Sequence, residues 1–258
     1  MMNLAEYRRT ATRLADYLPW AALVGQGVVL NKDGSFQRTA KFRGPDLDSA
    51  VAAELVAVAG RINNAFRRLG SGWSIFVEAQ RSEAATYPES TFPDAASALV
   101  DAERKADFED EGTHFVSGYF LTFLFLPPAE DAARTEAWLY EGREKAGVDA
   151  WEILRGFLDR TDRVLALLDG FMPECTWLDD AGTLTYLHST ISTNRHRVRV
   201  PEVPIHLDAL LADQSLTGGL EPRLGDRHLR VLTIVGFPTA TTPGLLDELN
   251  RLAFPYRW

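Results

Sequence analysis

A hairpin signal near the N-terminus constrains the fold more than any other feature of this 258-residue sequence. The run Gly27–Leu30 leads into Asn31-Lys32-Asp33-Gly34, and an Asp-Gly pair between two strand-like runs strongly indicates a turn. The following run, residues 35–43, alternates as a strand does, with two sets of side chains on opposite faces: Phe36, Arg38, Ala40 and Phe42 against Gln37, Thr39 and Lys41. The sequence therefore predicts an antiparallel sheet.

Helices and strands are interleaved around this hairpin. Before it, three- and four-residue spacing of apolar side chains predicts an amphipathic helix over residues 4–18, ended by Pro19. After it, we expect a helix over residues 47–69 capped by Asp46 or Asp48, a strand over 73–79, a helix from Asp94 to about 111 and a strand over 114–126. These elements make a first α/β lobe of order ββαβαβ, residues 1–128.

The remaining residues, 129–258, form a second expected lobe. Its predicted elements are helices over 130–145, 149–168 and from Asp179 or Asp180, a strand over 195–200, a short helix over 207–212, a hairpin with a Gly225-Asp226 turn and a strand over 228–236, a helix over 241–252 and a strand from 254. The last four of these elements, the two strands of the hairpin, the helix and the final strand, repeat the opening ββαβ order. The predicted class is thus α+β, with two lobes of ferredoxin-like sheets and packed helices and a helical insert between them. Because the second copy stops in its third strand, we expect the protein to continue beyond Trp258.

Composition narrows the classes of function. A net charge of −9 argues against a duplex-binding surface over the whole molecule, although a local basic patch is compatible with it. The single cysteine, Cys175, excludes an intramolecular disulfide and is expected to pack as a small apolar residue. The longest apolar stretch, residues 119–128, is far shorter than the roughly 20 residues of a membrane-spanning helix. We therefore expect a soluble chain, or one peripheral to a membrane.

Motifs for catalysis are missing from the sequence. None of the four lysines follows a glycine, so a P-loop cannot form, and Gly25-Gln26-Gly27 precedes a strand where a dinucleotide site needs a helix. The five histidines show no local metal-ligand spacing, and no G-x-S-x-G elbow occurs. The sequence predicts no catalytic residue, no cofactor-binding residue and no metal ligand.

Two basic clusters are candidates for binding a partner. On the predicted strand over residues 195–200, Arg195, Arg197 and Arg199 would share one face. The N-terminal helix carries a second cluster: Arg8, Arg9 and Arg13. Such arginines can bind an acidic protein surface, lipid headgroups or nucleic acid, and they can equally form a solvated face paired with nearby acids.

Several segments together resemble a known family. They are residues 14–20 (LADYLPW), 28–43 (VVLNKDGSFQRTAKFR), 72–81 (GWSIFVEAQR), 87–94 (YPESTFPD), 236–238 (GFP) and 245–249 (LLDEL). The chain resembles the N-terminal part of TrbE-type conjugal-transfer ATPases, of the CagE/TrbE/VirB family of type IV secretion. The resemblance covers nearly the whole chain and depends on many medium-length matches.

The resemblance implies a part of a larger machine. In that family a C-terminal RecA-like domain carries the Walker motifs, so ATP and magnesium are expected there and not in this chain. The implied partners are inner-membrane components of a type IV secretion system, the C-terminal ATPase domain and other copies of the chain; nucleic acid is not expected. The implied location is the bacterial cytoplasm, peripheral to the cytoplasmic face of the inner membrane. The alternative is a nucleic-acid-binding module that uses the basic strand.

Overall fold

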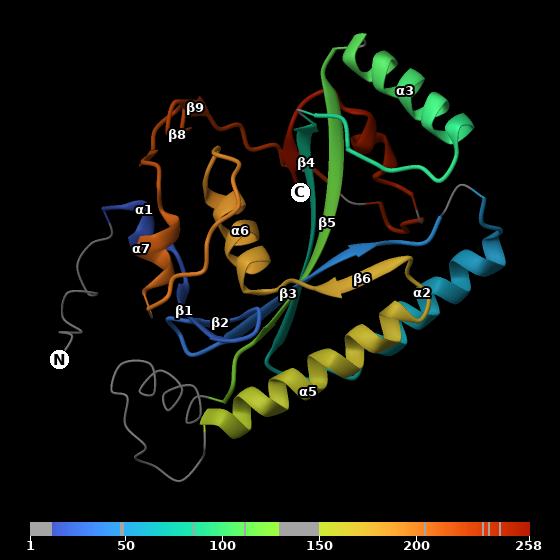
Figure 1. Cartoon of the computed structure of the whole chain (residues 1–258). Coiled ribbons are helices and arrows are strands. Elements are labelled where there is room, and N and C mark those ends of the chain that lie inside the picture. Colours follow the sequence, from blue (N-terminus) through green and yellow to red (C-terminus); the bar gives the residue numbers. More distant parts are fainter. Residues whose placement is uncertain are drawn as a thin grey trace. The chain divides into compact units, whose positions relative to one another are not determined.

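The protein is described by a computed structural model (Figure 1), which describes residues 12–46, 49–84, 86–110, 112–128, 150–203, 205–233, 235–236, 238–242 and 244–258. The predicted two-lobed α+β class is confirmed. Two compact units are present: unit 1 is Met1–Phe76 with Leu121–Thr239, and unit 2 is Val77–Phe120 with Ala240–Trp258. The helix expected over 130–145 lies outside the described residues, as does the N-terminal helix up to residue 11.

The two units divide the chain differently from the predicted lobes 1–128 and 129–258. Strands β4 (Trp73–Ala84) and β5 (His114–Phe125) are both long, and each contributes residues to both units. The chain therefore leaves unit 1 along β4 and returns to it along β5. The division into lobes 1–128 and 129–258 stays a prediction.

Unit 1 begins with a three-stranded antiparallel meander, here called the first meander: β1 (Trp20–Gly25), β2 (Val28–Asn31) and β3 (Phe36–Arg43). The predicted hairpin is confirmed, with Leu30 opposite Phe36 and Gly34 at a φ of 82°, a backbone conformation that favours glycine. Strand β1 was not predicted, because its run WAALVG has no polar alternation. It is recognisable as a strand through its pairing with β2.

Strand β3 also pairs with β5 and with β6 (Glu174–Trp177), so that the strand order in unit 1 is β1-β2-β3-β5-β4. The register with β6 runs from Ala40 opposite Trp177 to Arg43 opposite Glu174. Cys175 on β6 is buried as expected, and burial, followed by the charge of Asp169, raises the pKa of its thiol to about 11.

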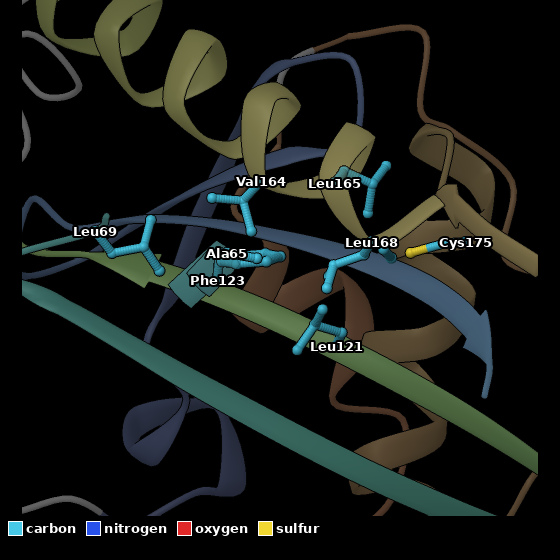
Figure 2. Close-up of a cluster of buried hydrophobic side chains, with 9 residues drawn as sticks. Ala65, Leu69, Leu121, Phe123, Val164, Leu165, Leu168 and Cys175 are labelled. Carbon is cyan, nitrogen blue, oxygen red and sulfur yellow. The ribbon is translucent and has the colours of Figure 1, made fainter. Parts of the chain in front are cut away.

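Helices α2 (Ala52–Phe66) and α5 (Ala150–Asp169) lie side by side and pack on one face of these strands (Figure 1). Figure 2 shows the core between them, which contains Ala40, Ala65, Leu69, Leu121, Phe123, Val164, Leu165, Leu168 and Cys175. A second cluster joins the first meander to α5 and contains Val28, Leu30, Phe36, Leu154 and Phe157. Burial of these side chains is the main force that holds the unit together.

Strand β3 is buried on both faces over residues 36–40, whereas the alternation suggested one apolar face. The reason is that α6 (Asp180–Ile191) and α7 (Leu207–Leu211) lie on the side opposite α5 (Figure 1). The predicted start of α6 is confirmed, because the Asp179 carboxylate accepts a hydrogen bond from the Gly182 N–H at 2.6 Å. Short helix α1 (Leu14–Tyr17) ends before Pro19, as predicted.

A second three-stranded antiparallel sheet, here called the small sheet, consists of β7 (Leu216–Thr217), β8 (Arg223–Leu224) and β9 (Arg227–His228). Its turn at Gly225 was predicted, and the strand over 228–236 was wrong beyond His228. Val231 and Leu232 are 82% and 78% exposed. Because these side chains are largely exposed, burial does not stabilise an extended strand there.

Unit 2 contains α3 (Ala95–Asp110), β10 (Tyr256–Arg257) and parts of β4 and β5. Asp94 caps α3 as predicted, through the Ser97 N–H at 2.8 Å. Strand β10 was expected as the third strand of a second ββαβ sheet; it pairs with β4 instead, Tyr256 opposite Arg81. The helix expected over 241–252 is a 3-10 helix, η2, confined to Asp247–Arg251.

Candidate functional site

The basic segment, residues 195–199, lies after the end of α6 and is not a strand, so the predicted strand over 195–200 is wrong. Within the segment, the Val198 N–H donates to the Thr185 hydroxyl of α6 at 3.0 Å. Val198 is also the buried side chain of the segment, 8% exposed. A contact with a helix therefore takes the place of a strand ladder.

The three predicted arginines of this segment are brought together on the surface of unit 1. Arg195, Arg197 and Arg199 are all exposed, on either side of buried Val198. A guanidinium nitrogen of Arg195 donates to the Ser189 carbonyl at 3.4 Å. The alternation of exposed arginine with apolar side chain is thus real around Val198, although Val200 is 43% exposed. The segment presents positive charge to solvent.

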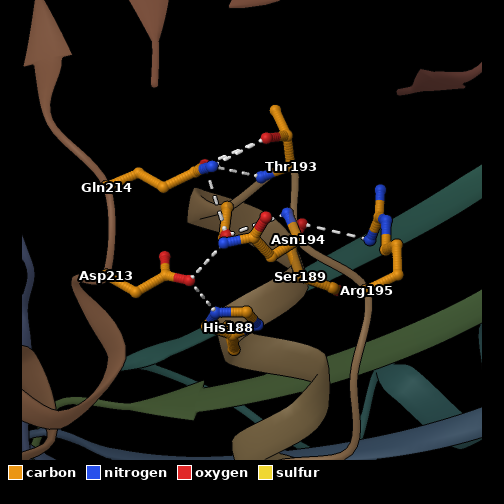
Figure 3. Close-up of polar contacts among 8 residues, drawn as sticks. His188, Ser189, Thr193, Asn194, Arg195, Asp213 and Gln214 are labelled. Atoms are coloured by element: carbon orange, nitrogen blue, oxygen red, sulfur yellow. Dashed lines mark hydrogen bonds and ion pairs between the residues drawn. The ribbon is translucent and has the colours of Figure 1, made fainter. Parts of the chain in front are cut away.

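Gln214 anchors the beginning of this segment (Figure 3). Its Oε1 accepts hydrogen bonds from the Thr193 backbone N–H at 2.9 Å and from the Ser192 hydroxyl at 3.3 Å. Its Nε2 donates to the Thr193 hydroxyl at 2.9 Å. One side chain, about 20 residues further along the chain, therefore satisfies the backbone where α6 ends.

A second anchor is the pair of His188 and Asp213, whose Nε2 and Oδ2 atoms lie 3.0 Å apart. His188 is 3% exposed, and its ring centroid lies 4.5 Å from that of His196. Asp213 also accepts from the Asn194 side chain at 2.8 Å. Partial burial opposes its ionisation, but the hydrogen bonds from Asn194 and His188 outweigh burial and hold the pKa of Asp213 below its ordinary value. A charged, fixed carboxylate thus locks the start of the basic segment.

The N-terminal cluster is described only partially. Arg13 is exposed directly before α1, and its backbone N–H donates to the Asp16 carboxylate at 2.9 Å. Arg8 and Arg9 lie outside the described residues. The cluster remains a prediction.

The anchoring residues were not predicted from the sequence. His188 and the adjacent pair Asp213 and Gln214 belong to two separate stretches without a shared motif, and the nearest sequence signal was the predicted cap of α6 at Asp179 or Asp180. The portion of the chain that the structure describes contains no group of His, Cys, Asp and Glu able to hold a metal ion. Within the same ranges, no helix is both long and apolar enough to cross a membrane. Chemically, the arrangement offers charge and hydrogen-bond recognition.

Comparison with known proteins identifies the class to which this chain belongs. Residues 27–133 match the family model described as the type IV secretion system ATPase VirB4/TrbE, N-terminal domain. A conjugal transfer protein TrbE of Rhizobium radiobacter is 33% identical over 275 residues, which cover 100% of this chain and 33% of that protein. In Sinorhizobium fredii a probable conjugal transfer protein TrbE is divided into two chains, and the first of them is 41% identical over 140 residues, 53% of this chain and 93% of that protein.

The chain belongs to the TrbE family of conjugal transfer proteins, as a domain of the VirB4/TrbE N-terminal type. It spans about a third of the length of the Rhizobium radiobacter relative.

Proposed function

We propose that this chain is a non-catalytic docking and assembly domain of a type IV secretion ATPase. In this proposal the whole protein hydrolyses ATP to power pilus assembly and substrate transfer, and a RecA-like domain outside this chain binds ATP and magnesium. The observation that carries the proposal is the basic segment: three exposed arginines on a loop that buried His188 and the Gln214 side chain hold in place.

A fixed loop suits docking because the loop then loses less conformational entropy when a partner binds. Arginine is also the side chain best matched to carboxylates, since its planar guanidinium can form two parallel hydrogen bonds. We therefore assign the basic segment to an acidic surface on an inner-membrane component of the secretion system or on the catalytic domain of the same protein. Such docking places the chain at the cytoplasmic face of the inner membrane, and a homo-oligomer is a further arrangement that the proposal allows.

An ATP-turnover assay tests the first part of the proposal, that this chain does not itself hydrolyse ATP. The purified 258-residue chain, supplied with ATP and magnesium, should release phosphate no faster than buffer does. Magnesium-dependent turnover by the chain, retained through successive purification steps, would overturn this half.

The docking half is tested by changing Arg195, Arg197 and Arg199 to alanine together. Binding to the purified inner-membrane complex of the cognate system, or to the separate catalytic domain, should weaken by at least about tenfold, which corresponds to about 1.4 kcal/mol. The matched control changes Arg223, Arg227 and Arg230, arginines in and after the small sheet, and removes the same charge.

Single-stranded DNA distinguishes the alternative function. Salt-dependent DNA binding that is lost in the Arg195/Arg197/Arg199 variant and kept in the control would favour a nucleic-acid-binding module. Equal loss of partner binding in both variants would show that net charge, and not the basic segment, carries the interaction.

A further inference from the structure

Three arginines of unit 1 converge on one depression without a charged partner. Arg68 follows the end of α2, and Arg160 and Arg163 lie on α5. All three are exposed, and among the described residues none of them forms a hydrogen bond, an ion pair or a ring contact. In a chain of net charge −9, three neighbouring cations without an ion-pair partner in the described part of the chain are unusual.

The depression is a cavity of about 490 Å³ between the C-terminal end of α2 and the neighbouring turns of α5, which Figure 1 shows side by side. Besides the arginines, its wall includes Ser71 and the apolar side chains of Val164 and Leu167. Leu69 and Val164 line the cavity and also belong to the core cluster drawn in Figure 2, so the wall of the cavity is continuous with packed side chains. Among the described residues, no carboxylate lines the cavity.

Ordinary structural roles account for some of this arrangement. Arg68 comes just after the last turn of α2, where the helix dipole favours a cation. Arg160 and Arg163 lie before the last turn of α5, so the dipole explains neither. Asp159 neighbours them on the same helix, yet the described structure contains no ion pair between it and either arginine. Neither of these two guanidinium groups therefore has a carboxylate partner among the described residues.

We propose that this cavity binds a phosphate group. Guanidinium groups bind phosphate oxygens through paired, charge-assisted hydrogen bonds, and the Ser71 hydroxyl adds a neutral donor. Leu167 lines the cavity and its side chain is 39% exposed, so it offers an apolar surface to the organic portion of a phosphate-bearing ligand. The phosphate comes from a free phosphate compound or from an anionic lipid headgroup, since both present the same oxygens. This site is separate from the basic segment and does not depend on the docking role.

Calorimetric titration of the 258-residue chain with inorganic pyrophosphate, at low and constant ionic strength, tests the site. Binding should weaken at least about tenfold in the Arg160→Gln/Arg163→Gln variant, because each lost guanidinium removes charge-assisted hydrogen bonds. Both side chains are exposed, so the variant should fold. The control, Arg155→Gln/Arg230→Gln, removes the same charge from exposed positions outside the cavity and should bind within about twofold of the parent.

Co-sedimentation with phosphatidylcholine vesicles, with and without phosphatidic acid, separates the two sources of phosphate. Pyrophosphate binding that depends on Arg160 and Arg163, without vesicle binding, assigns a free phosphate compound. Vesicle binding that requires phosphatidic acid and the same two arginines assigns a lipid headgroup. Absence of both, or equal weakening in the variant and the control, overturns the site. These readouts are independent of the changes at Arg195, Arg197 and Arg199, so this proposal and the docking proposal can fail separately.

Discussion

The first meander and the small sheet are both three-stranded and antiparallel, both have a glycine turn at positive φ, and both belong to unit 1, yet they differ greatly in extent. The first meander has strands of six, four and eight residues, whereas each strand of the small sheet has two. Val28, Val29 and Leu30 are completely buried. In the small sheet Leu224 is the buried residue among the strands, at 8% exposed.

The two sheets differ in whether a helix packs on them, and they do not differ in the chemistry of their turns. Helix α5 supplies Leu154 and Phe157 to one face of the first meander. The small sheet is held chiefly by polar contacts, among them the backbone bond from the Gly225 N–H to the Ser215 carbonyl at 2.9 Å and the adjoining Gln214 network. A turn signal therefore positions a hairpin, and burial determines how many residues join it.

Removing a buried side chain of α5 beneath the first meander should have the largest effect on the free energy of unfolding. Phe157 is 1% exposed and stacks on Phe36 at 5.7 Å and on Trp73 at 5.5 Å between ring centroids. Phe157→Ala should lower the free energy of unfolding by about 3–5 kcal/mol, because it leaves a cavity beneath the first meander. Urea denaturation measures it, with Leu232→Ala as the control, expected within about 0.5 kcal/mol of the parent. Similar values for the two would refute the contrast in burial.

The turn glycines give the next largest effect. The φ of Gly27 is 66°, and a Cβ added there would lie 2.2 Å from the Leu178 carbonyl oxygen. The backbone N–H of Gly27 donates to the Asp180 carboxylate at 2.6 Å, which holds the turn in place. Gly27→Ala should therefore cost about 2–4 kcal/mol, from left-handed strain plus a backbone clash.

Gly225→Ala in the small sheet is the matched variant. Its φ is 60°, but a Cβ there would meet the end of the Gln214 side chain at 2.9 Å, and a small shift of this flexible side chain relieves the contact without breaking its hydrogen bonds to Thr193. We expect a cost of about 1–2 kcal/mol from the strain alone. Equal thermal destabilisation by the two alanines would mean that the crowding at Gly27 relaxes freely.

The last predicted effect, similar in size to that at Gly225 at pH 7 and smaller at low pH, concerns the polar anchor before the small sheet. Because the pKa of Asp213 is lowered in the folded state, its contribution is fully present above its unfolded pKa of about 3.9 and is lost as pH falls through the lower folded pKa. Asp213→Asn should cost about 1–2 kcal/mol at pH 7 and less as the pH falls through that range. Urea denaturation from about pH 7 to about pH 3 checks this, and the Asp226→Asn control, with a side chain 82% exposed, should follow the parent. A constant difference at all pH values would contradict the assignment.

The sequence was informative where a local signal and tertiary burial agree. The Asp33-Gly34 turn, the caps at Asp94 and Asp179 and the apolar run of β5 are all recognisable from the residues alone. Each of these features is determined by residues that lie within a few positions of it in the sequence. Strand β6 was not predicted, because it has only four residues and pairs with β3, which is distant in the sequence.

The wrong predictions arise where contacts between distant residues override the local pattern. Residues 195–200 alternate as a strand would, but the Val198 N–H has a hydroxyl partner on α6 and no neighbouring strand. For the candidate site, the exposed arginines could be predicted from their spacing. The anchors at His188, Asp213 and Gln214 could not, because their partners are defined only once α6 and α7 are in place.

The discontinuity of unit 2 has a practical consequence for dissecting this protein. Its β4 strand, between Ala79 and Arg81, is paired by the last residues of the chain: the Ala79 and Trp258 backbones exchange hydrogen bonds at 2.9 and 3.1 Å, and the Leu252 carbonyl accepts from Arg81 at 2.7 Å. A shortened chain that ends before residue 240 would expose this side of β4 as an open edge, and open edges recruit other strands. An expression boundary chosen after the small sheet would therefore favour self-association, whereas one that keeps β10 would not.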